Sequence, residues 1–169
     1  MLQAEYERGT KDSDVLETSD LGGDIRASLI ELAGPGTDLH KRHKLYIEIV
    51  SSGLPLLPQA PVWLDVPELN QDLNHFRVEV LHVVDVVVSK LKRFHGSDAQ
   101  DIEAMVDLAL VPHDRLLDRF RSAVDLFLLD SRAADLPKYV RNLHRVERDM
   151  LGVAETAIEL PGWLDSDDD

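Results

Sequence analysis

Residues 12–16 place two carboxylates, Asp12 and Asp14, on one side of a predicted strand. Side chains in extended backbone alternate between the two faces of a strand, so these two aspartates share a face. Adjacent carboxylates repel each other unless water screens them or a cation neutralises them. Mg²⁺ is a hard cation that prefers carboxylate oxygens. The stretch therefore predicts either a cation site at the start of a strand or a solvated acidic turn.

The composition of the chain excludes several kinds of functional site and of partner. With 169 residues, of which 44% are hydrophobic, it has material for one domain with a real core. The absence of cysteine removes disulfides, thiol nucleophiles and cysteine-ligated zinc. A formal net charge of -14 opposes binding of extended nucleic acid, which depends on Lys and Arg contacts to phosphates. Neither a secretory signal nor an apolar run of membrane-spanning length is present, which predicts a cytoplasmic protein without a membrane partner.

The N-terminal half predicts a helix and a second strand. Apolar residues at helical spacing from Leu21 to Leu32, preceded by Ser19 or Asp20 as a cap, predict a helix that ends in the Gly-Pro-Gly turn at residues 34–36. A basic run then leads into residues 45–50, a strand by its β-branched and aromatic content. The lone carboxylate in this strand, Glu48, indicates either a functional acid or an edge strand with one solvated face.

The rest of the chain predicts two short strands and then helices. Four prolines between residues 51 and 74 predict a long irregular connection with a short strand at 62–66, and a further strand is predicted at 76–81. Helices are predicted at 82–94, from a Ser97–Gln100 capping box, at 113–130 and after Pro137. Lys90 lies beside the apolar stripe of the first helix, so its ammonium group must reach solvent or meet an anion. The predicted fold class is α+β.

The order of these features resembles the nucleotidyltransferase fold of the polymerase-beta superfamily, and in particular its small bacterial AbiEii-like branch, which includes toxins of toxin-antitoxin systems. The matching segments are residues 8–16, 45–50, 83–94 and 98–102. The resemblance covers residues 8 to 110 and implies a small mixed sheet with flanking helices. We therefore expect a nucleotidyltransferase-like core over residues 1–110, a helical hairpin of the same domain over 111–160, and an acidic tail over 161–169.

The resemblance implies an activity and a set of site residues. The reaction would be metal-dependent transfer of a nucleoside monophosphate from an NTP to a hydroxyl acceptor. The residues implied to hold Mg²⁺ or Mn²⁺ are Asp12, Asp14 and Glu48, with Asp65 and Glu79 as rival third carboxylates. Lys90 would stabilise phosphate charge, and Asp101, in preference to Asp98, would position Lys90 or contact the nucleotide. Arg8, Thr10 and Lys11 would add nucleotide contacts.

One departure from the family pattern concerns the phosphate cradle. The family carries a Gly-Ser or Gly-Gly turn upstream of its acidic pair, where backbone amides bind the triphosphate. Residues 1–7 contain no glycine, so we expect this unit to be missing. The sequence thus leaves two alternatives to an active enzyme. One is a degenerate relative that acts through a protein partner or as a homo-oligomer, and the other is an unrelated acidic scaffold whose features are all structural.

Overall fold

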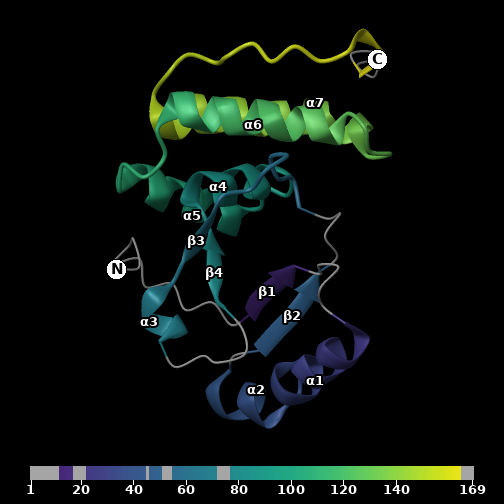
Figure 1. Cartoon of the computed structure of the whole chain (residues 1–169). Coiled ribbons are helices and arrows are strands. Elements are labelled where there is room, and N and C mark those ends of the chain that lie inside the picture. The colour runs from purple at the N-terminus through teal and green to yellow at the C-terminus, as the bar shows by residue number, and fades with distance from the viewer. Residues whose placement is uncertain (1–11, 17–21, 45, 51–54, 72–76, 165–169) are drawn as a thin grey trace. The chain divides into compact units, whose positions relative to one another are not determined.

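The computed structural model describes residues 12–16, 22–44, 46–50, 55–71 and 77–164 (Figure 1). The chain has an α+β fold, as the sequence predicts. Its described residues up to Pro55 form one compact unit, and those from Leu56 onward form a second, larger one. The helices predicted within 111–160 fall in the larger unit together with the segment from Leu56. Within the described ranges, no helix combines the length and the apolar character needed to cross a membrane.

The smaller unit is built on a parallel pair of strands. β1 (Asp12–Leu16) and β2 (Tyr46–Val50) lie where the sequence predicts them, and they pair in parallel. Parallel neighbours cannot be joined by a tight turn and need a crossover connection. Two helices, α1 (Gly23–Ala33) and α2 (Asp38–His43), provide this connection, and α1 packs on β2.

The two helices of the smaller unit agree with the sequence predictions to different extents. α1 begins after Gly22, and the predicted caps Ser19 and Asp20 lie outside the described residues. It ends at Ala33, with Gly34 as its C-cap in the predicted turn, and glycine suits this position because a Cβ there would lie 2.5 Å from the carbonyl oxygen of Ile30. α2 is not among the predicted helices. Thr37 starts it, since its hydroxyl accepts a hydrogen bond from the His40 backbone N–H at 3.3 Å.

The larger unit begins with a short antiparallel hairpin. Its strands are β3 (Trp63–Asp65) and β4 (Glu79–Leu81), each shorter than predicted, and α3 (Pro67–Asn70) follows β3. The hairpin pairs Asp65 with Glu79 and Trp63 with Leu81. Residues of the hairpin, α3 and the next two helices line one open pocket.

The helices of the larger unit enclose the core. They are α4 (Val83–Leu91), α5 (Gly96–Asp107), α6 (His113–Phe127) and α7 (Leu136–Arg145), with the 3-10 helices η1 (Ala133–Asp135) and η3 (Gly162–Leu164) and the π-helix η2 (Val146–Leu151), which continues α7. Figure 1 shows α6 and α7 stacked on α4 and α5. Apolar residues of these helices meet in one cluster, whose fully buried members include Val87, Leu91, Ile102, Leu116, Phe120, Leu136 and Leu143.

The start of α5 differs from the predicted capping box. Ser97 and Gln100 both lie inside the helix, which is capped by His95 instead. The carboxylate of Asp98 accepts a hydrogen bond from the backbone N–H of His95 at 3.0 Å. Asp98 takes the role predicted for Gln100, and its carboxylate also pairs with Lys90 of α4 and with Arg93 just after that helix.

Candidate functional site

The first group of predicted site residues lies on the parallel strands of the smaller unit. The β1–β2 register pairs Asp14 with Glu48 and Asp12 with Tyr46. Paired positions on neighbouring strands belong to the same face of a sheet, and positions two apart along a strand share that face. The backbone therefore places the two acidic positions of β1 and the acidic position of β2 on one face.

Several predicted residues of this group lie beyond what the structure describes. Arg8, Thr10 and Lys11 are outside the described residues, and for Asp12 and Asp14 only the strand backbone is described. Glu48 has an exposed side chain, while its neighbours Ile47 and Ile49 are half-buried. Among the side chains that are described, no three His, Cys, Asp or Glu groups lie close enough to hold a metal ion.

The rival third carboxylates, Asp65 and Glu79, occupy the hairpin of the larger unit and already share a cation. Arg77 Nε lies 2.8 Å from Asp65 Oδ1 and 4.0 Å from Glu79 Oε1. Asn70 Nδ2 donates a second hydrogen bond to Asp65 Oδ1, at 2.6 Å. The hydrogen bond from Arg77 lowers the pKa of the Asp65 carboxyl group, against the opposing effect of desolvation. These contacts give both acids a structural role, because each of them pairs with Arg77 in the hairpin.

Lys90 meets two carboxylates at the junction of α4 and α5. Its Nζ lies 2.9 Å from Asp101 Oδ2 and 3.3 Å from Asp98 Oδ1. The Lys90 side chain is 21% exposed, whereas that of Asp98 is only 1% exposed. Of the two outcomes that the sequence left open for this lysine, reaching solvent or meeting an anion, the structure shows the second. These two contacts fix the position of the ammonium group.

Asp98 also stabilises the turn between α4 and α5. It accepts hydrogen bonds from Arg93 Nε and Nη2, both at 3.0 Å, and from the backbone N–H of His95. Arg93 lies three residues after Lys90, and this spacing places two cations on the same side of the chain, a signal that was available in the sequence. Burial of Asp98 disfavours its charge, but hydrogen bonds from Arg93 and His95 outweigh that effect and lower its pKa to about 2.

The depressed pKa of Asp98 makes this junction sensitive to acid. An aspartate whose native pKa lies below its unfolded value stabilises the fold above the unfolded pKa and loses that contribution as pH falls through the native pKa. For Asp98 the loss should run from pH 3.8 to about 2, and its full size is about 2 kcal/mol. Urea unfolding should therefore show a destabilisation by Asp98→Asn at neutral pH that shrinks over this range. Asp107→Asn, at an exposed position of α5, is the control, and an equal pH dependence in both variants would contradict the prediction.

The predicted site residues thus form two groups. Asp12, Asp14 and Glu48 lie on paired strands of the smaller unit. Lys90, Asp98 and Asp101 form one ion-pair cluster in the larger unit. The catalytic and binding roles of both groups stay predictions.

Comparison with known protein families identifies the class as nucleotidyltransferase. The model of one family, described as "nucleotidyltransferase of unknown function (DUF6036)", matches residues 1–150. The chain belongs to this family. The AbiEii-like branch suggested by the sequence stays a prediction. No curated protein and no solved structure matches the chain.

Proposed function

We propose that the chain transfers a nucleoside monophosphate from an NTP to a hydroxyl acceptor in a reaction that requires divalent metal ions. The observation that carries this proposal is the parallel register of β1 and β2, which pairs Asp14 with Glu48. Membership of a nucleotidyltransferase family supports it independently. The register also favours Glu48 as the third acid, because it pairs Glu48 with Asp14, whereas Asp65 and Glu79 belong to a separate antiparallel sheet.

The donor set suits Mg²⁺ or Mn²⁺. Asp12, Asp14 and Glu48 offer only carboxylate oxygens, the ligands that hard divalent cations prefer. Metal ions bound there would neutralise phosphate charge and favour an in-line displacement at phosphorus. The three acids would hold the ions and orient the triphosphate, and the exposed position of Glu48 leaves its carboxylate accessible to them.

The cationic residues have complementary roles in this proposal. Lys90 would donate hydrogen bonds to phosphate oxygens, where fixed positive charge stabilises the transition state of phosphoryl transfer. Asp101 and Asp98 support this role because their contacts of 2.9 and 3.3 Å hold the Lys90 ammonium group in place. Arg8, Thr10 and Lys11 would add contacts to the nucleotide.

Thermal unfolding in the presence of nucleotide tests the proposal. Each of the four NTPs is added with Mg²⁺, and at a concentration of about 100 Kd the bound ligand should stabilise the native state by about 2.7 kcal/mol, a rise in Tm of roughly 5 °C or more. The rise should disappear with EDTA and in Asp14→Asn. Glu31→Gln, at an exposed position of α1 in the same unit, should retain it. A Tm that no NTP raises in the presence of either Mg²⁺ or Mn²⁺ would refute the proposal.

A further inference from the structure

The open pocket of the larger unit is lined by the β3–β4 hairpin, α3, α4 and α5 (Figure 1). Its volume is about 450 Å³, a usual size for a site that binds a small molecule. The apolar residues that line it are Leu64 and Val80, which pair across the hairpin, Val83 and Val86 of α4, and Met105 of α5. The pocket therefore offers mainly apolar surface to a ligand.

The pocket lies beside the ammonium group of Lys90. Lys90 follows Val86 by four residues in α4, and Asp101 precedes Met105 by four residues in α5. Residues four apart lie on the same face of a helix, one turn or about 5.4 Å along it. Val86 and Met105 both line the pocket, and Lys90 Nζ lies 2.9 Å from Asp101 Oδ2. The pocket and the Lys90–Asp101 contact therefore occupy consecutive turns of the same helix pair.

The pocket face of these two helices is accessible, while their core face is not. Val86, Lys90 and Met105 are half-buried. Val87 and Ile102, on other faces of the same helices, are fully buried members of the core. A ligand can therefore reach Val86, Met105 and Lys90 without disturbing the packing of the core.

The charges around the pocket favour one orientation of a ligand that has both an apolar and an anionic part. Asp65 and Glu68, both exposed, line the pocket, and Asp65 is paired with Arg77 at 2.8 Å. Carboxylates repel phosphate groups, so the anionic part would not enter the pocket. Lys90 supplies a cation one helical turn away. The apolar part would thus occupy the pocket while the anionic part lies at Lys90.

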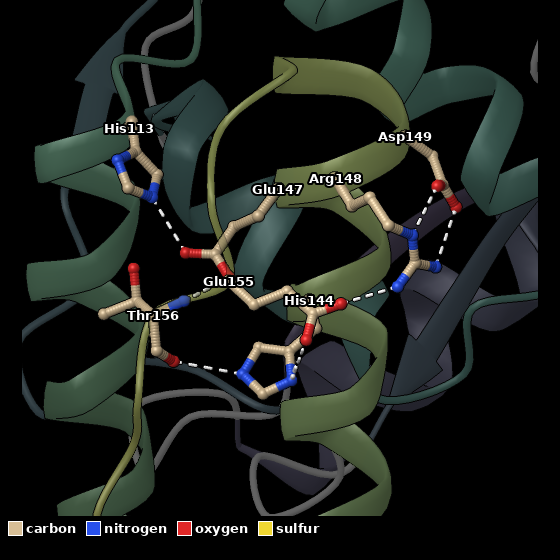
Figure 2. Close-up of polar contacts among 7 residues, drawn as sticks. All are labelled: His113, His144, Glu147, Arg148, Asp149, Glu155 and Thr156. Carbon is tan, nitrogen blue, oxygen red and sulfur yellow. Dashed lines mark hydrogen bonds and ion pairs between the residues drawn. The ribbon is translucent and has the colours of Figure 1, made fainter.

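The C-terminal segment of the chain lies on another side of the larger unit. Residues 153–161 run along the outer side of α6 and α7 (Figure 1), and none of the described residues 153–164 lines the pocket. Glu147 holds this segment, because its Oε2 accepts a hydrogen bond from the Thr156 backbone N–H at 3.0 Å (Figure 2). Its Oε1 lies 2.8 Å from His113 Nε2. The segment therefore provides positions for control substitutions away from the pocket.

We propose that the pocket binds the nucleobase of the nucleotide whose phosphates Lys90 would contact. The inference rests on the proposed function, in which the Lys90 ammonium group donates hydrogen bonds to phosphate oxygens. A nucleotide carries a flat base, separated from its phosphates by a ribose, and the base is the part that suits an apolar pocket next to a cation. Burial of roughly 60 Å² of apolar surface in the pocket should tighten nucleotide binding on the order of tenfold.

Calorimetric titration compares ligands with and without a base. Each of the four NTPs carries a base, whereas inorganic tripolyphosphate presents phosphates alone, and each ligand is titrated with Mg²⁺ into the full chain. Val80→Phe and Val86→Phe would fill the pocket from the hairpin and from α4. We expect each variant to raise the Kd of the NTPs on the order of tenfold and to leave the Kd of tripolyphosphate unchanged.

A matched control is Val153→Phe, which makes the same change in the C-terminal segment. Val153 is 36% exposed and Val80 is 40% exposed, so both variants should fold, which circular dichroism checks. Val153→Phe should leave the Kd of every ligand unchanged.

The pattern of the Kd values separates this inference from the proposed function. If the folded pocket variants bind the NTPs as tightly as the unaltered chain does, the inference is overturned and the proposed function stands. An equal weakening of NTP and tripolyphosphate binding also overturns it, because the base would then play no part. If the unaltered chain binds none of these ligands with either Mg²⁺ or Mn²⁺, the proposed function fails, and this inference fails with it.

Discussion

Glu48→Gln is expected to lower the rate of nucleoside monophosphate transfer on the order of a hundredfold or more, because it removes one charge from the acids that would hold the metal ions. The reason for this choice of residue is structural. The β1–β2 register pairs Glu48 with Asp14 on one face of the parallel strands. The amide retains the shape of the side chain and loses its charge, so the fold should be unaffected. Asp14→Asn should cause a loss of similar size.

The measurement is the rate of nucleotide incorporation from labelled NTP with Mg²⁺, together with a thermal unfolding curve for each variant. Glu79→Gln and Asp65→Asn serve as controls, since both acids are paired with Arg77 in the separate antiparallel hairpin. They should retain the rate of the unaltered chain within severalfold. If Glu79→Gln lost transfer while Glu48→Gln retained it, the assignment of the third carboxylate would be wrong.

Asp85→Ala is expected to reduce the free energy of unfolding by about 3–5 kcal/mol, the cost of removing one partner of a buried ion pair. Asp85 is 1% exposed, and its oxygens accept hydrogen bonds from Arg119 Nε and Nη2, both at 2.6 Å. Its Oδ2 also accepts a hydrogen bond from the backbone N–H of Val62, at 2.8 Å. The substitution leaves both donors without this acceptor and removes one of the links between the segment before β3 and α4.

Urea unfolding followed by circular dichroism measures this effect. Asp118→Ala, at an exposed position on α6 beside Arg119, should change the free energy of unfolding by no more than about 0.5 kcal/mol. The double variant Asp85→Ala with Arg119→Met should lose less than the sum of the two single changes, because it removes the unpaired cation as well. A loss below about 1 kcal/mol for Asp85→Ala would show that water or another group replaces the carboxylate.

Much of the fold follows from local patterns in the sequence. The strand predicted at residues 12–16 and the strand predicted at residues 45–50 from its β-branched and aromatic content correspond to β1 and β2, which the structure confirms. The helical spacing of Leu116, Phe120 and Val124 predicts the buried face of α6, also confirmed. The missed helix α2 and the misplaced cap of α5 have different causes. Thr37 is a standard N-cap residue that bonds the His40 N–H three residues on, so the start of α2 was available in the sequence. The start of α5 involves Asp98, which also pairs with Lys90 and Arg93, and residue type alone does not reveal that choice.

The candidate site likewise has features that the sequence predicts and others that only the tertiary structure shows. The sequence by itself determined the acidic pair Asp12 and Asp14, the lone acid in the second strand, and the need of Lys90 for solvent or an anion. Only the tertiary structure decided that Asp14 pairs with Glu48, that Lys90 meets Asp98 and Asp101, and that Glu147 holds Thr156. The physical reason is the distance along the chain over which each kind of signal acts. Periodicity and charge spacing act within one element, whereas register and ion-pair choice depend on how separate elements pack, and residue spacing along the chain does not encode that packing.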